Sequence, residues 1–439
     1  MRMTAALLQI DRFLHRNRLY GQGIDLRPYC ASFLAEMERG LDGKRSSLPM
    51  IPTYIEASRA VPRGERVIAL DAGGTNMRVA VVSFDPAGKP VVENLTRHRM
   101  PGVDEALDRD AFFCALAQVV LPAAARVDKI GFCFSYPVEM MPDRDGRLIH
   151  FTKEIKARGV DGELIGANLG RALAAAGASR PARITLLNDT VATLLAGRNA
   201  LPDRRFDGFI GVVCGTGINV ACVEHNALIR KTPGLDAAGS QIVNTESGSF
   251  ARGVFGPVDD AFDATTADPG RYRHEKTISG AYLGALCLFA ARAAARDGCI
   301  SAEGSAVLER IPGLSTRELN DFLLYPDGGG NPLAAVCAQM PVSDAQALYR
   351  LCDSLVERAA AMVAVNLGAV LLKSGAGQDP RYPACIAVDG TTFWQLRTFR
   401  LRVESHMRRL LTGRRERAWE ITSVEDAPLL GAAIAALTN

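Results

Sequence analysis

The sequence lacks several patterns that would assign it to other classes of protein. It has no run of about 18 or more uncharged apolar residues, so we expect no membrane-spanning helix. The first residues carry charges without an apolar segment and a cleavage site, which argues against a signal peptide. Basic and acidic side chains number 51 and 48, and the net charge is +3. Such a balance predicts neither nucleic acid nor an anionic membrane as a partner.

Paired cysteines are also missing. The ten cysteines stand singly, without any Cys-x-x-Cys, and several lie in apolar segments that resemble strands. A free cysteine in such a segment behaves as a small hydrophobic residue. We therefore expect neither a disulfide framework nor a structural zinc, and we predict a reducing, cytoplasmic location.

Two common phosphate-binding loops are absent as well. Gly43-Lys44 is followed by Arg45, so no Gly-x4-Gly-Lys-Ser/Thr sequence occurs. No Gly-x-Gly-x-x-Gly leads from a strand into a helix. These absences exclude the P-loop and dinucleotide-binding folds as the basis for any nucleotide site.

The chain is long enough, at 439 residues, for two domains with cores of their own, and 48% of its residues are hydrophobic. Apolar periodicity and glycine or proline stops predict mainly helical segments along much of its length. These helical segments are residues 3–40, 163–176, 275–297, 316–324, 343–371 and 429–437. A last strand is predicted at residues 386–388.

A strand–glycine turn–strand unit occurs twice. Residues 67–70 and 77–84 flank the first turn, and residues 209–214 and 219–223 flank the second. Because the same unit returns after about 140 residues, it predicts a duplicated α/β domain with helices on the sheets.

The composition of these turns suits phosphate. Glycines let the backbone approach an anion closely, and successive N–H groups in such turns form an anion-binding concavity. The first turn offers Asp71, Gly73, Gly74, Thr75, Asn76 and Arg78, and the second offers Gly215, Thr216 and Gly217. A carboxylate such as Asp71 at a strand end can hold a hydrated Mg²⁺. A single turn of this kind is usually only a hairpin, but two copies favour phosphate binding.

Longer blocks resemble the hexokinase family. The first turn, written out as Asp71-Ala72-Gly73-Gly74-Thr75-Asn76-Met77-Arg78, looks like the family's first phosphate motif. Residues 131–138 and 148–153 together resemble its sugar-binding signature. Later blocks follow in the family's order at 187–193, 215–219, 244–250, 275–284 and 389–391. The resemblance runs from about residue 30 to the C-terminus.

This resemblance implies a two-lobed actin-like (ribonuclease H-like) α/β fold, with mixed sheets flanked by helices and a cleft between a small and a large domain. The small domain would contain residues 64–187 and 425–439. The large domain would contain residues 1–63 and 188–424. The implied reaction transfers the γ-phosphoryl group of ATP, with Mg²⁺, to the 6-hydroxyl of a hexose, glucose first, as in the opening step of glycolysis. We expect the lobes to close on the sugar, and the chain to be a monomer or a homodimer.

The resemblance also implies roles for particular residues. Asp189 matches the catalytic base. An isolated Asp at this position would more simply cap a helix that starts at Thr190, but within this block the catalytic role is favoured. Lys153 would lie near the reacting hydroxyl and the incoming phosphate. The polar shell around the sugar would be Ser135, Tyr136, Thr152, Lys153, Asn188, Asp189, Asn219, Glu246 and Glu275. Gly390 and Thr391 would lie on the adenosine side.

Three positions depart from the family pattern. Glu154 stands where the family usually has Gly, Ser247-Gly248-Ser249 where it has Trp-Gly-Ala, and residues 427–430 replace Gly-Ser-Gly-Lys/Arg. One alternative is a sugar-binding sensor with this fold and little turnover. Another is the bacterial repressor/kinase group, but its cysteine-rich zinc motif is missing here. Eight arginines in residues 395–417 allow a nucleic-acid interpretation, but without interleaved aromatic residues a solvated helix face is favoured.

Overall fold

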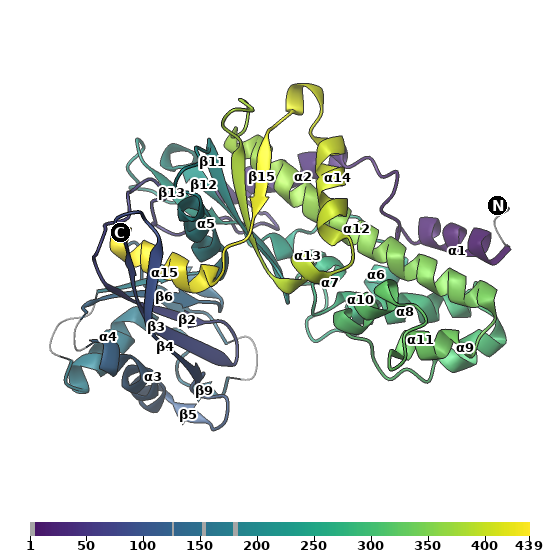
Figure 1. Cartoon of the computed structure of the whole chain (residues 1–439), viewed down its shortest axis with the longest axis horizontal. Coiled ribbons are helices and arrows are strands. Elements are labelled where there is room, and N and C mark those ends of the chain that lie inside the picture. The colour runs from purple at the N-terminus through teal and green to yellow at the C-terminus, as the bar shows by residue number, and fades with distance from the viewer. Residues whose placement is uncertain (1–4, 125–126, 152–154, 179–182) are drawn as a thin grey trace.

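The computed structural model describes residues 5–124, 127–151, 155–178 and 183–439, and it contains two β-sheets with a helical body beside them (Figure 1). One sheet has five strands in the order β10-β6-β2-β3-β4, and the other has six in the order β1-β13-β12-β11-β14-β15. Each sheet combines parallel and antiparallel pairs. Mixed sheets flanked by helices are what the sequence predicts.

The five-stranded sheet carries the first glycine turn. Its strands are β2 (Val67–Ala72), β3 (Asn76–Phe84), β4 (Pro90–Arg99), β6 (Lys129–Phe134) and β10 (Arg183–Leu187). Short pairs flank it, β5 (Leu107–Asp108) with β9 (Ala157–Arg158) and β7 (Val138–Met140) with β8 (Gly146–Leu148). Strand β2 is apolar on both sides because alternate residues enter different cores. Ile68 and Leu70 share a core with helices α3 (Arg109–Ala124) and α4 (Ile165–Ala175).

The six-stranded sheet carries the second glycine turn. Its strands are β1 (Ile51–Pro52), β11 (Gly208–Cys214), β12 (Ile218–His225), β13 (Ser240–Asn244), β14 (Ala384–Asp389) and β15 (Trp419–Thr422). Strands β11 and β12 form the antiparallel hairpin, and β14 lies parallel to β11 on its other side. The ends of β11 and β14 therefore meet at one edge of the sheet, where residues 215–217 and 390 follow.

Two helices lie between the sheets, α5 (Asp189–Ala200) and α15 (Ala427–Thr438) (Figure 1). A single core joins residues of β2, β3 and β6 to both helices and to β12 and β13. The helices are closely apposed because Gly431 has no side chain: a Cβ there would lie 2.0 Å from the carbonyl oxygen of Ala192. The division of the chain into a small and a large domain stays a prediction. Helix α15 contacts strands β2 and β6 of the five-stranded sheet and also helix α5.

The remaining helices form the body to the right of the sheets in Figure 1. They are α1 (Ala5–Arg16), α2 (Arg27–Leu41), α6 (Pro257–Asp263), α7 (Arg273–Ile278), α8 (Leu283–Arg296), α9 (Ala302–Leu308), α10 (Thr316–Leu324), α11 (Pro332–Cys337), α12 (Val342–Ser374), α13 (Thr391–Gln395) and α14 (Phe399–Leu410). Short 3₁₀ turns η1 (Asn226–Leu228), η2 (Ser247–Ser249) and η3 (Gly413–Arg415) complete the order.

Helix α12 is the axis of this body. Among the described residues it is the one helix long and apolar enough to cross a membrane, and 89% of its most apolar stretch is buried inside the fold. It packs against α1, α2, α8 and α14. Burial on several sides explains an apolar composition that would otherwise suggest a membrane span.

Both predicted hairpins and the strand at 386–388 are confirmed, as are helices at 163–176, 316–324, 343–371 and 429–437 within one or two residues at most ends. Two predicted helices are interrupted instead. The segment 3–40 breaks between α1 and α2, where Gly21 and Gly23 disfavour helix. The segment 275–297 breaks between α7 and α8, where the N–H of Gly280 binds the carbonyl oxygen of Gly215, so a tertiary contact overrides helix periodicity.

The solvated helix face predicted for the arginine-rich segment is wrong in part. Helix α14 ends at Leu410 and buries one side against α12. The side chain of Arg402 is only 13% exposed, and it pairs with Asp353 and Glu357 of α12. Periodicity alone could not show this, because both partners lie some 50 residues earlier in the chain.

Candidate active site

The first glycine turn is bordered by an ion-paired arginine. Asp71 is the penultimate residue of β2, and Arg78 lies opposite it on β3 in antiparallel register. Arg78 donates to Oδ2 of Asp71 from Nε at 3.0 Å and from Nη2 at 2.8 Å. Its other terminal nitrogen, Nη1, pairs with Asp426, which precedes α15 in the left-handed conformation at φ 53°. No local sequence pattern indicates Asp426, because Asp426 lies 348 residues after Arg78 in the chain.

The residues around this turn divide into supporting and exposed groups. Tyr136 is buried, its hydroxyl donates to the carbonyl oxygen of Gly74, and its ring packs on Phe151. The backbone N–H of Ser135 donates to the carbonyl oxygen of Ala72 at 3.1 Å, which leaves its half-buried side chain beside the turn. Asn76 is exposed, and Thr75 is half-buried. Tyr136 thus braces the turn, and its role as a sugar contact stays a prediction.

The second glycine turn is fixed by backbone contacts from three elements. The carbonyl oxygen of Gly215 accepts the N–H of Gly280 at 2.7 Å and the hydroxyl of Thr392 at 2.9 Å. Gly390 lies against it at φ 120°, where a Cβ would be 2.3 Å from the carbonyl oxygen of Cys214. Only glycine fits this position. The turn and the start of α13 are therefore positioned together. Thr216, a predicted donor, and Thr391, predicted on the adenosine side, are both exposed there.

Asp189 opens helix α5, in a position where the sequence allowed either a catalytic or a capping role. The N-cap residue is Asn188, whose side-chain oxygen accepts the N–H of Thr190 at 2.9 Å. Oδ1 of Asp189 accepts the same N–H at 2.7 Å. Burial raises the pKa of Asp189, and the nearby charge of Asp71 raises it further, although the bond from Thr190 opposes this. Asn188 and Asp189 share this N–H, and because a carboxylate offers about four lone-pair sites, Asp189 keeps acceptor capacity for another group.

A second carboxylate, Glu246, is held by two amides. Nδ2 of Asn219 lies 3.2 Å from Oε1 of Glu246, and Nδ2 of Asn244 lies 2.7 Å from the same oxygen. The amides are linked in turn, because Nδ2 of Asn219 also donates to Oδ1 of Asn244 at 2.7 Å. Glu246 adopts φ 54° to reach this place. Burial raises its pKa, the two amides lower it, and the charge of Asp189 adds to the rise.

The buried Asn244 was not among the predicted site residues. Its position at the end of β13, two residues before Glu246 in the same sequence block, is the signal that could have identified it.

The third carboxylate, Glu275, lies on the short helix α7. Its Oε2 accepts the backbone N–H of Ile218 at 3.1 Å, directly after the second glycine turn. A Cβ on Gly217 would be 2.6 Å from this oxygen, so the glycine turn and the carboxylate are in close contact. Burial raises the pKa of Glu275 to about 7, and the charges of Glu246 and Asp268 contribute to the rise.

The geometry gathers three carboxylates with raised pKa values beside two glycine turns. Asp189, Glu246 and Glu275 have more acceptor capacity than the neighbouring donors fill, and each charged form is disfavoured by burial. A ligand with several hydroxyl groups would supply the missing donors. The elements that carry these groups come from both sheets, so the two halves of the molecule contribute to one site. The predicted Thr152 and Lys153, with the departure at Glu154, lie outside the described residues.

Comparison with known proteins agrees with this geometry. Two family models described as hexokinase match residues 13–199 and 209–438. The chain belongs to the hexokinase family. It is 30% identical to hexokinase-5 of Oryza sativa subsp. japonica, over 88% of this chain and 81% of the relative. It is 26% identical to human hexokinase-2, over 92% of this chain and 46% of that longer relative.

The solved structures confirm the fold. A hexokinase from Schistosoma mansoni complexed with glucose aligns with a TM-score of 0.76 at 22% identity, over 99% of this chain and all of that one. A second hexokinase crystal structure aligns with a TM-score of 0.78 at 21% identity, over 99% of both chains. The predicted actin-like sugar kinase fold is therefore confirmed. As a family member, this hexokinase is an ATP-dependent hexose kinase, and the non-catalytic sensor is not favoured.

Proposed function

We propose that this hexokinase transfers the γ-phosphoryl group of MgATP to the 6-hydroxyl of glucose, with Asp189 as the general base. The observation that carries the proposal is the placement of Asp189 at the start of α5, where burial raises its pKa and where it shares the capping N–H of Thr190 with Asn188. A carboxylate of raised pKa is a stronger base and accepts a hydroxyl proton more readily. The neighbouring carboxylates provide acceptors for the other sugar hydroxyls.

Glucose is the proposed substrate because of the relatives as well as the site. The Schistosoma mansoni neighbour was crystallised with glucose. In this chain Glu246, with Asn219 and Asn244, forms an amide–carboxylate group suited to adjacent hydroxyls that must both donate and accept. A site built from such groups rejects a sugar that lacks one of those hydroxyls, because a buried polar group is then left unpaired.

The phosphates of ATP would lie along the two glycine turns. Arg78 and the hydroxyls of Thr75 and Thr216 are the donors available to them, and Gly390 and Thr391 lie on the side assigned to adenosine. Lys153 is proposed to contact the incoming phosphate. Each of these groups stabilises negative charge without chemical change, which is the main requirement of phosphoryl transfer.

The residues present suit Mg²⁺. Among the described residues, no group of three or more His, Cys, Asp or Glu could hold a metal by itself. Mg²⁺ beside a nucleotide needs less than that, since it retains most of its waters and binds one or two carboxylates. Asp71 supplies one carboxylate at the first turn, where it now pairs with Arg78. Bound there, the ion would neutralise charge on the phosphates.

The experiment is a coupled assay of sugar-dependent ADP formation with MgATP across glucose, fructose, mannose and N-acetylated hexosamines. We expect turnover on glucose or another plain hexose, which ranks the substrates. Sugar binding without turnover on any sugar would contradict the proposal and favour the sensor. A cytoplasmic location, a place in glycolysis and a monomeric or homodimeric state remain proposals that accompany this one.

A further inference from the structure

The short helix α13 backs the second glycine turn but has little to stabilise it on its own. It spans five residues, Thr391–Gln395, and an isolated helix of that length is not stable in water. Its first end is fixed, because Gly390 lies against Gly215 and the Thr392 hydroxyl donates to the carbonyl oxygen of Gly215. The position of α13, and with it the shape of the turn, therefore depends on what holds its other end.

That other end is held by contacts with two helices of the body. The backbone N–H of Arg397 donates to Oδ1 of Asn320 on α10 at 2.7 Å, and Nη1 of Arg397 lies 3.3 Å from Oδ1 of Asp353 on α12. The next residue, Thr398, has φ 54°. A β-branched residue in that region is strained, and it persists only where surrounding contacts enforce it.

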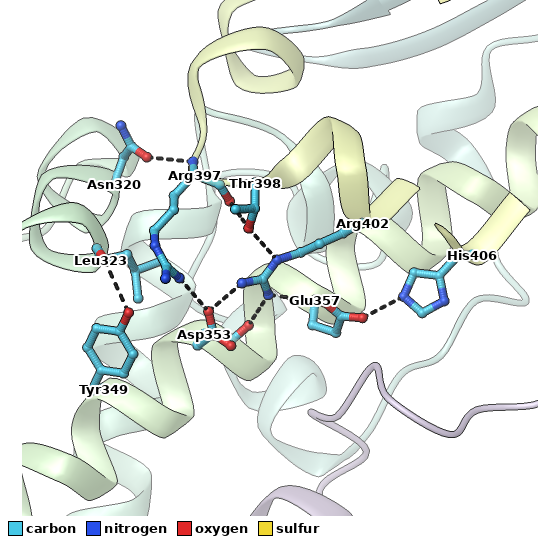
Figure 2. Close-up of polar contacts among 9 residues, drawn as sticks. All are labelled: Asn320, Leu323, Tyr349, Asp353, Glu357, Arg397, Thr398, Arg402 and His406. Atoms are coloured by element: carbon cyan, nitrogen blue, oxygen red, sulfur yellow. Dashed lines mark hydrogen bonds and ion pairs between the residues drawn. The ribbon is translucent and has the colours of Figure 1, made fainter. Parts of the chain in front are cut away.

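Arg402 provides the enforcing contacts (Figure 2). Its Nε donates to the hydroxyl of Thr398 at 2.9 Å, and its terminal nitrogens bind the side chain and the carbonyl oxygen of Asp353. Nη1 also lies 3.1 Å from Oε2 of Glu357, whose other oxygen is 2.8 Å from Nε2 of His406. Asp353 and Glu357 are one turn apart on α12, and Arg402 and His406 are one turn apart on α14. Four charged or polar groups thus join the two helices in register.

We propose that this group, the Arg402 clamp (Asp353, Glu357, Arg397, Thr398, Arg402 and His406), is a positioning device for the nucleotide half of the active site. It sets the far end of α13 and so the glycine turn against which the phosphates lie. The clamp touches neither of the glycine turns, and its residues are positioning residues. The inference rests on the proposed function in one respect, that nucleotide binds beside α13.

The charges of the clamp explain why its loss would move the second glycine turn, which the clamp does not contact. The side chain of Arg402 is only 13% exposed, so replacing Asp353 removes the negative charge that it shares with Arg397 and leaves Glu357 as the remaining carboxylate beside Arg402. The strain at Thr398 would then be released by movement of the loop that ends α13. The sugar shell has anchors of its own on α5, β12, β13 and α7, so we expect a smaller change there, although Glu275 contacts the second glycine turn.

The test compares Asp353→Asn with the wild-type protein by calorimetric ADP binding, by KM for ATP and for glucose, and by thermal melting. Asn keeps the size of the side chain and removes its charge. We expect the Kd for ADP and the KM for ATP to rise about fivefold, with KM for glucose within about twofold. Asp353→Glu, which restores the carboxylate, should recover most of the loss. The matched control is Asp379→Asn, which removes an exposed Asp379–Arg381 pair and should leave all values unchanged.

Two results would overturn the inference: unchanged ADP affinity in a folded Asp353→Asn protein, or an equal rise in the KM values for ATP and glucose. If Asp353→Asn does not fold, Glu357→Gln tests the same clamp more mildly, and an unaltered Kd for ADP in that variant is equally contradictory. An inactive wild-type protein would count against the proposed function instead, while ADP binding would still test the clamp.

Discussion

At the scale of single residues, the proposed reaction depends on carboxylates whose protonation is controlled by their surroundings. Asp189, Glu246 and Glu275 lie within one polar region, and burial raises the pKa of each. Sites that perform proton transfer commonly contain such groups. Substitution of these carboxylates should therefore affect turnover or the pH dependence of stability, whereas substitution of an unperturbed surface carboxylate should not.

Replacing Asp189 by Asn should abolish most turnover while leaving sugar binding. Asn retains an acceptor for the N–H of Thr190 but cannot accept the hydroxyl proton, so kcat should fall about 10²- to 10⁴-fold. Glucose affinity, measured by calorimetry, should change only a few-fold. Asp110→Asn makes the same change in the first turn of α3, on an exposed side chain, and should be neutral. Near-normal kcat in Asp189→Asn would remove Asp189 from its assigned role.

Glu275 should make stability depend on pH in a defined direction. Its pKa of about 7 lies above the ordinary 4.5, so the folded protein holds this proton more tightly than the unfolded chain. The stabilisation is present below about pH 4.5 and is lost as pH rises through 7. In Glu275→Gln this fall should be missing, so the difference in unfolding free energy between the two proteins should change steadily between pH 4.5 and 7. Parallel urea titrations across that window would contradict the assignment.

At the scale of elements, the hairpins were the most predictable part of the structure. Apolar strands ending in glycine turns identify β2–β3 and β11–β12 from local sequence, because both the strand pattern and the turn chemistry are local. The helices α10 and α12 were equally predictable from the local sequence. The breaks at Gly21–Gly23 and at Gly280 were missed, because helix periodicity continued on both sides of each.

The candidate site was predictable where a sequence block carries both a turn and its chemistry. Asp71 and Arg78 were predicted in this way, whereas Glu246 was predicted from the resemblance to the hexokinase family. Asp426 and the Arg402 clamp were not found, because their contacts join segments far apart in the chain. Asn244 was missed although it lies only two residues before Glu246, with which it bonds. The bond from the Tyr136 hydroxyl to the carbonyl oxygen of Gly74 was likewise not predictable from local sequence, and the role of Tyr136 as a sugar contact stays a prediction.

The junction of β14 and α13 should tolerate no side chain at Gly390. A Cβ would collide with Cys214 and the backbone would be strained at φ 120°, so Gly390→Ala should lower the unfolding free energy by about 2 kcal/mol or more and weaken ATP binding. Gly170→Ala offers the contrast. It lies inside α4 with open space around it, and should stabilise the protein by about 0.5–1 kcal/mol. Equal effects of the two substitutions in denaturant unfolding would contradict this account of the junction.

At the scale of the whole molecule, one site is assembled from elements on both sheets. The first glycine turn and Ser135 belong to the five-stranded sheet, while the second glycine turn, Asn219 and Glu246 belong to the six-stranded sheet or its connections. A ligand that contacts both groups gains most when they approach each other. Helices α5 and α15 lie between the sheets and would have to accommodate such movement.

Glucose should therefore make the molecule more compact. We expect a smaller radius of gyration in solution scattering and slower proteolysis when glucose is present. A hexose that the coupled assay shows to be neither substrate nor inhibitor provides the control. Identical scattering curves with and without a saturating concentration of glucose would exclude closure of the lobes.

The most direct test of the central claim is to identify the product by ³¹P NMR after incubation of glucose with MgATP. The wild-type protein should produce ADP and glucose 6-phosphate in equal amounts, and Asp189→Asn should produce neither on the same timescale. ADP formed without a sugar phosphate, a phosphate on another hydroxyl, or equal yields from the two proteins would contradict the account.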